Sequence, residues 1–244
     1  MPMNGIHLGG IGPYLLLIIV PVLLGLWAQF RVKSAFGRAS QVPASSGMTG
    51  AQVAEEIMKA HNITDVRVEP TRGVLSDHYD PKAKMLRLSE GVYDGHSVAA
   101  LGIAAHEAGH ALQHASGYGP LTLRSNLVPF MVFGSQASPW VLLLGIVMLG
   151  AAPFLGQTLL LVGIVGLALV LLFQLITLPV EYDASRRAKD LLQSTGLVAP
   201  GAEAQAMNSV LNAAALTYVA ATVTTFGTLL YYLLILLNSN NRRQ

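Results

Sequence analysis

The sequence predicts a mainly helical membrane protein with about four transmembrane helices and one small α+β module that contains a β-hairpin. Hydrophobic residues make up 52% of the 244 residues and charged residues only 11%, whereas an ordinary soluble domain has about 25% charged residues. The apolar residues form several long runs, each close to the ~20 residues that span a bilayer. A polar stretch after the first run instead alternates between helix-like and strand-like patterns.

The first apolar run covers residues 11–30, and its basic neighbours follow the run: Arg31, Lys33 and Arg38. A signal peptide has basic residues in front of its apolar core and a small-residue cleavage site behind it. We therefore expect residues 1–30 to be a retained transmembrane helix whose C-terminal end lies in the cytoplasm. Residues 31–47 are expected to be a polar linker.

Two further spans are expected within residues 120–179. They cover residues 139–154 and 159–179 and are joined by an uncharged turn around Gly156. Residues 120–136 either lie along the membrane or extend the next span. The last span begins near residue 213, within a C-terminal segment that comprises residues 213–244.

The polar stretch, residues 48–119, has the pattern of a folded module. Thr49 is a good N-cap for a helix. Residues 66–69 and 85–88 alternate as strands do, and residues 76–81 form a further strand that runs into a turn. The last two strands are expected to form the hairpin.

Within this module, residues 106–110 have the sequence His-Glu-Ala-Gly-His in a predicted helix. Residues four apart lie on one helical face, so His106 and His110 can bind one ion. Glu107 can then reach a water on that ion. A catalytic zinc has three protein ligands and one open position, and the chain has no cysteine. A third histidine or carboxylate ligand must therefore come from elsewhere.

The third ligand is predicted to be Glu181. It follows a span directly and begins a charged helix in the segment 180–212, and an ionisable group at the membrane surface is a candidate functional residue. A structural alternative is that this run anchors the chain to lipid headgroups through Arg186, Arg187 and Lys189. We favour the ligand because two histidines and a glutamate form a known catalytic zinc set.

Three stretches carry a resemblance to a known family: HEAGHALQH, SDHYDPKAKMLRLS and LPVEYDASRRA. They resemble the YugP-type bacterial membrane zinc metallopeptidases over nearly the whole chain, and are more distantly similar to HtpX-like membrane peptidases. The resemblance implies a gluzincin-like catalytic module with one Zn²⁺ per chain. It implies His106, His110 and Glu181 as zinc ligands and Glu107 as the catalytic base.

The sequence departs from the HtpX-like pattern at one position. Those proteins have an aspartate four residues after the ligand glutamate, where this chain has Ser185. Asp183 is nearby but two residues from Glu181, so it faces another side of the helix. Which of the two orients a zinc histidine stays open. Candidate donors to the oxyanion are His78, Tyr79 and Tyr182.

The predicted function is a membrane-embedded, zinc-dependent endopeptidase that acts on peptide or protein substrates and has the lipid bilayer as its other partner, with membrane protein quality control suggested by analogy. The alternative is a non-catalytic zinc-binding scaffold or partner subunit. An intramembrane protease is disfavoured because the apolar stretch before His106 has only about eight residues, too few to span. The net charge of +2 gives no argument for nucleic acid, and a homo-oligomer or membrane partner stays open.

The topology predicts the side on which the module lies. Two spans separate His106 from Glu181, so both lie on one side of the membrane. The basic residues near residue 31 and near residue 187 are on that side, which the positive-inside rule assigns to the cytoplasm. Arg242 and Arg243 would lie on the opposite side, which is a small conflict with the rule.

Overall fold

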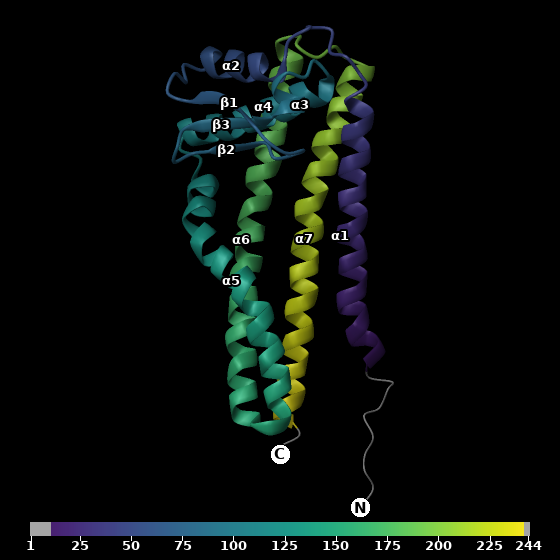
Figure 1. Ribbon diagram of the computed structural model, residues 1–244, viewed down its shortest axis with the longest axis vertical. Coiled ribbons are helices and arrows are strands. Elements are labelled where there is room, and N and C mark those ends of the chain that lie inside the picture. Colours follow the sequence, from purple (N-terminus) through teal and green to yellow (C-terminus); the bar gives the residue numbers. More distant parts are fainter. Residues whose placement is uncertain (1–10, 242–244) are drawn as a thin grey trace, which may run out of the picture. The chain divides into compact units, whose positions relative to one another are not determined.

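The computed structural model describes residues 11–241. Arg242 and Arg243, on which part of the topology depends, and the first ten residues of the expected N-terminal helix lie outside these residues. The chain is mainly helical (Figure 1). Its elements are α1 (Ile11–Ala39), α2 (Gly50–Ala60), β1 (Arg67–Thr71), β2 (His78–Asp80), β3 (Met85–Ser89), α3 (Glu90–Tyr93), α4 (Val98–Ala115), α5 (Gly119–Ala151), α6 (Pro153–Ser194) and α7 (Ala202–Asn241).

Four helices among the described residues are long and apolar enough to cross a membrane, which confirms the predicted number of spans. The candidate spans are Leu16–Ala39, Gly119–Ala151, Pro153–Ser194 and Ala202–Ser239. The chain divides into two compact units. Unit 1 comprises residues 1–27, 124–176 and 218–244, and unit 2 comprises residues 28–123 and 177–217.

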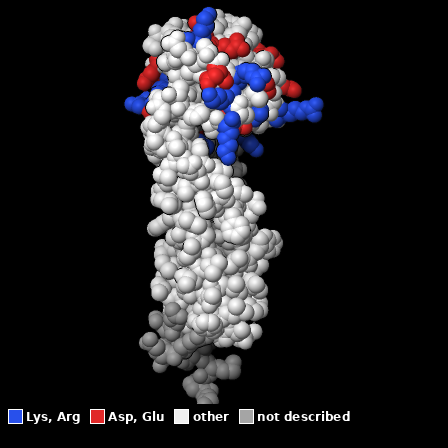
Figure 2. Space-filling view, turned by 90° about the vertical axis from the view of Figure 1, so that its left-hand side faces the viewer, with Lys and Arg blue, Asp and Glu red and all other residues white. Residues whose placement is uncertain are grey.

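The two units differ sharply in charge. Among the described residues, unit 1 has one charged residue, Arg124, and every other Lys, Arg, Asp and Glu belongs to unit 2. In Figure 2 the charged side chains gather together, and the rest of the described surface in view has none. Unit 1 is therefore suited to hydrocarbon, and the described ionisable groups other than Arg124 are available for chemistry in unit 2.

The helices of unit 1 differ from the expected spans at the connections. α5 is one helix that contains Pro129 and Pro139, so residues 120–136 extend the following span. The predicted turn around Gly156 is wrong: α5 ends at Ala151 and α6 begins at Pro153. Proline is favoured at the first position of a helix because its missing N–H has no intrahelical partner there.

Glycines let α5 and α6 approach closely within the chain. A Cβ on Gly134 would lie 3.0 Å from the carbonyl oxygen of Gly166, and one on Gly163 would lie 2.5 Å from Leu142. In the apolar solvent of a bilayer, close packing at small residues is a main source of helix association. Gly163 and Gly166 thus pack inside unit 1.

In unit 2, α1 continues to Ala39, so the first part of the expected linker 31–47 is helical. Ala35 and Ala39 are buried in the core of this unit, 3% and 1% exposed, which explains why the helix does not end with the apolar run. The predicted N-cap Thr49 is confirmed. Its Oγ1 accepts a hydrogen bond from the backbone N–H of Gln52, whose side chain accepts one from the Thr49 N–H.

The three strands form one sheet in the order β1-β3-β2. β2 is antiparallel to β3, and β1 is parallel to it, with Arg67 opposite Met85. Figure 1 shows β3 between the other two strands, with α2 alongside β1. The expected strand 66–69 was placed too early, since β1 runs through Pro70 to Thr71. Pro70 is tolerated because β1 is an edge strand.

Close backbone packing at the start of α2 gives a first prediction. A Cβ on Gly50 would lie 2.3 Å from the carbonyl oxygen of Val92, which is backbone and cannot rotate away. Gly50→Ala should therefore destabilise unit 2 by about 1–3 kcal/mol, measured as a lower midpoint of thermal unfolding. Gly91→Ala is the control, because its Cβ would meet nothing within 4 Å. Equal midpoints for the two variants would contradict the prediction.

Candidate metal centre

The two histidines of the motif lie on α4, a helix held in the core of unit 2. Ser97 caps its first turn by accepting from the Ala100 N–H. Small buried side chains surround the motif, including Ala104, Ala105 and Ala108 at 0% exposed. The rings of His106 and His110 stand edge to face with centroids 4.8 Å apart. Both imidazoles therefore reach the same side of α4.

The small residues of α4 let α6 approach. A Cβ on Gly109 would lie 3.0 Å from the carbonyl oxygen of Ala184 on α6, so the helices touch through their backbones within the motif itself. Glu181 lies one turn earlier on α6 and is 2% exposed. This contact brings the predicted third ligand to the two histidines.

Glu181 does not begin a new helix, as the sequence had suggested. α6 runs unbroken from Pro153 to Ser194 with Pro179 inside it. Proline removes one backbone hydrogen bond, and transmembrane helices tolerate this loss when neighbouring groups compensate. Tight packing holds the helix on both sides of Pro179: Thr177 is 2% exposed and Val180 is 0% exposed. Glu181 thus lies within one continuous helix that is buried at this point.

The geometry of the three side chains fits a zinc ion. Oε2 of Glu181 lies 3.2 Å from Nε2 of His106 and 3.8 Å from Nε2 of His110, and the candidate ligand atoms lie within 4.8 Å of one another. Tetrahedral zinc, with bonds of about 2.0–2.2 Å, holds its donor atoms about 3.3–3.5 Å apart. The donor types suit zinc, and the three side chains lie close enough together that they could hold one metal ion.

The electrostatics of the cluster also favour a cation. Burial alone would lower the pKa of His110, but the hydrogen bond to Glu181 and the charges of Glu107 and Glu181 outweigh it and raise that pKa above its ordinary value. The two carboxylates therefore create a negative potential at His110. Glu107 follows His106 on α4 and is 8% exposed.

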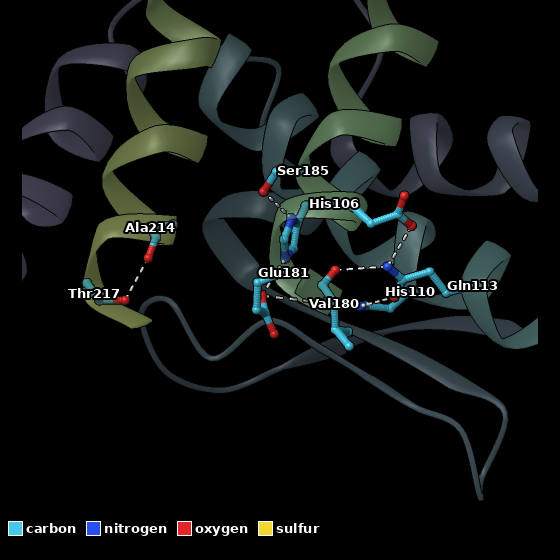
Figure 3. Close-up of polar contacts among 9 residues, drawn as sticks. His106, His110, Gln113, Val180, Glu181, Ser185, Ala214 and Thr217 are labelled. Carbon is cyan, nitrogen blue, oxygen red and sulfur yellow. Dashed lines mark hydrogen bonds and ion pairs between the residues drawn. The ribbon is translucent and has the colours of Figure 1, made fainter. Parts of the chain in front are cut away.

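Each histidine also has a polar partner for its second ring nitrogen (Figure 3). Oγ of Ser185 lies 3.1 Å from Nδ1 of His106. Nδ1 of His110 lies 3.0 Å from Oε1 of Gln113. Gln113 in turn donates to the carbonyl of Val180 at 2.8 Å and to the carboxylate of Asp183 at 2.9 Å.

The sequence left open whether Ser185 or Asp183 orients a candidate zinc histidine, and these contacts bear on that choice. Ser185 contacts His106 directly, and Asp183 reaches His110 through Gln113. Gln113 was not among the residues expected at the site, although it is a polar residue one turn after His110 on a helix of mostly small and apolar residues. It is fully buried, at 0% exposed.

Two of the three candidate oxyanion donors have polar contacts outside the candidate metal site, and the third is exposed. The Tyr79 hydroxyl lies 2.8 Å from Nδ1 of His114, and burial raises the pKa of Tyr79 to about 12, which keeps it a neutral phenol. Nδ1 of His78 contacts the carbonyl of Ser76. Tyr182 is 52% exposed. Their roles stay predictions.

Fold and site together define a membrane protein with a candidate zinc centre of the hydrolytic type in its charged unit. Residues 14–237 match the family described as "putative neutral zinc metallopeptidase". The chain is also 46% identical over 228 residues to a protein of Bacillus subtilis (strain 168) named "putative membrane protease YugP", which covers 93% of this chain and 98% of that protein. No solved structure matches. The chain belongs to this YugP-type family of membrane zinc metallopeptidases.

Proposed function

We propose that the protein is a zinc-dependent endopeptidase in which His106, His110 and Glu181 hold the metal and Glu107 is the catalytic base. The observation that carries this proposal is the convergence of the three ligand side chains from α4 and α6. Family membership supports the protease class. The buried carboxylate of Glu107, directly next to a ligand, supports catalysis over a purely structural metal, because a structural site needs no base.

In the proposed hydrolysis of a peptide bond, each residue of the site has a separate role. Bound zinc would supply Lewis-acid polarisation and lower the pKa of a bound water to about 7. Glu107 takes a proton from the attacking water and later delivers it to the leaving amine. His106 and His110 keep their positions through Ser185 and Gln113. The burial of Glu181 within the continuous helix α6 holds the third ligand in place during turnover.

An extended substrate has a binding edge close to the site. β2 is an edge strand and packs against α4, the helix that carries both histidines. A peptide can add to such an edge through main-chain hydrogen bonds, which bind an extended chain with little dependence on its sequence. We therefore propose β2 as the strand along which the substrate lies.

We infer that unit 2 faces the cytoplasm, because among the described residues every Lys and Arg except Arg124 belongs to it. The chain has no cysteine, so single introduced cysteines test this topology cleanly. Glu55→Cys at an exposed position of α2 should react with a membrane-impermeant maleimide only after intact cells are opened. Phe154→Cys, which is 79% exposed next to the α5–α6 turn, should react without opening. The reverse pattern would invert the topology.

The endopeptidase activity is tested with the detergent-purified chain and an unfolded model protein. Mass spectrometry of the products should find new internal termini, because a catalytic zinc next to an edge strand cuts within an extended chain. Products shortened only from one end would indicate an exopeptidase. Bound zinc without any cleavage of several unfolded proteins would favour the alternative, a non-catalytic zinc-binding scaffold.

A further inference from the structure

We infer that Gln113 is a positioning residue that fixes the tautomer and ring orientation of His110 for the metal, and that Asp183 holds Gln113 in the required orientation. This inference rests on the proposed function, since it concerns how one of the three ligands is prepared. Figure 3 shows the side chains from His110 to Gln113 and on to α6.

The orientation of the Gln113 amide follows from its partners. An amide has one end that donates and one that accepts. One end lies against the carbonyl of Val180 and the carboxylate of Asp183, at 2.8 and 2.9 Å. Both partners only accept, so this end must be the NH₂ group. A flipped amide would set its oxygen against two acceptors in a fully buried place, at a high cost.

The orientation of the Gln113 amide determines the tautomer of His110. With the NH₂ group committed, Oε1 of Gln113 faces Nδ1 of His110 at 3.0 Å. Oε1 can only accept, so Nδ1 must carry the hydrogen. In a neutral imidazole, Nε2 then has the free lone pair. Nε2 is also the atom nearest Glu181 Oε2, at 3.8 Å, so the lone pair is on the nitrogen that a metal would use.

The two histidines are fixed in different ways. His106 contacts the hydroxyl of Ser185, and a hydroxyl can donate or accept, so this contact leaves either tautomer possible. Gln113 permits one tautomer only. Asp183 stabilises this arrangement because Arg186 and Arg187 bind its carboxylate at 2.5 and 2.6 Å, which keeps it ionised and therefore an acceptor. The chain of contacts runs from two arginines to a metal ligand.

The test separates the acceptor of Gln113 from its donors. Gln113→Met has a similar unbranched shape but no hydrogen-bonding amide, and loses both. Gln113→Glu keeps an oxygen that accepts from the His110 Nδ1–H, whether the carboxyl is protonated or not, but loses at least one donor to α6. For each purified variant, zinc affinity is measured by competition with a chromophoric chelator, and stability by the thermal midpoint of the zinc-free protein.

Gln113→Met should bind zinc about 10–100-fold more weakly, as is usual when an outer partner of a zinc histidine is lost. Gln113→Glu should bind zinc nearly as tightly as the wild type although its thermal midpoint falls. Asp77→Ala is the control for stability alone, because Asp77 holds the backbone N–H and hydroxyl of Ser89 in another part of unit 2. It should lower the midpoint and leave zinc affinity unchanged.

Zinc affinity that is unchanged in Gln113→Met, or that falls equally in the Met and Glu variants, would overturn the positioning role. Should Gln113→Met fail to fold, Gln113→Asn replaces it, since the shorter side chain keeps the amide but withdraws its oxygen from His110. A wild-type protein that binds no zinc would overturn the proposed function itself. A wild-type protein that binds zinc, with variants of the same zinc affinity, would overturn only the positioning role of Gln113.

Discussion

Glu107→Gln should retain its zinc and lose cleavage of an unfolded model protein by about 10²–10⁴-fold, the usual contribution of a general acid–base group. Glutamine has nearly the same shape but cannot take a proton from the attacking water. Zinc binding should persist because the three ligand side chains are unchanged. The measurement is zinc per chain together with the initial rate of cleavage, in wild type and variant.

Glu55→Gln is the matched control, because it makes the same chemical change at an exposed position of α2. It should cleave at the wild-type rate. Residual activity of Glu107→Gln equal to that of the control would remove Glu107 from the mechanism. A variant that loses both zinc and activity would instead indicate that Glu107 supports the metal site.

The second large effect is expected for Glu181→Gln. The change replaces a buried anionic ligand with a neutral amide, which loses both the charge that attracts the ion and a strong oxygen donor. The zinc dissociation constant should rise by more than the 10–100-fold that loss of an outer partner produces, and cleavage should fall with it at low zinc. Competition with a chelator measures the affinity.

A zinc affinity for Glu181→Gln that equals the wild type would assign the third ligand to another residue. Raising the zinc concentration separates two explanations for lost activity. Partial recovery at high zinc indicates weakened binding, and no recovery with zinc bound indicates that Glu181 also positions the ion for the reaction.

Features that depend on residues close together in the sequence were predicted, whereas features that depend on residues far apart were missed. The pairing of His106 with His110 depends only on the helical repeat, because residues four apart in a helix lie on the same face. Glu181 was predicted as the third ligand because it directly follows an apolar run and completes a His₂Glu set. Gln113 was missed because its hydrogen-bond partners on α6, Val180 and Asp183, are 67 and 70 residues away in the chain.

The same reason accounts for the differences in the fold. The N-cap at Thr49 is local and was predicted. The parallel pairing of β1 with β3 depends on a non-local register that no nearby residue specifies. α6 continues through Pro179 because packing in unit 2 holds it, whereas the sequence shows only a residue that usually ends helices. Tertiary contacts decided both elements.

The most direct measurement is a zinc titration of the chelated, zinc-free protein with cleavage as the readout. Cleavage should be absent without zinc and should rise linearly until one zinc per chain is bound, then level off. This is expected because His106, His110 and Glu181 form one candidate centre. Cleavage that persists in the zinc-free protein, or zinc that binds without any cleavage, would contradict a catalytic zinc at these residues.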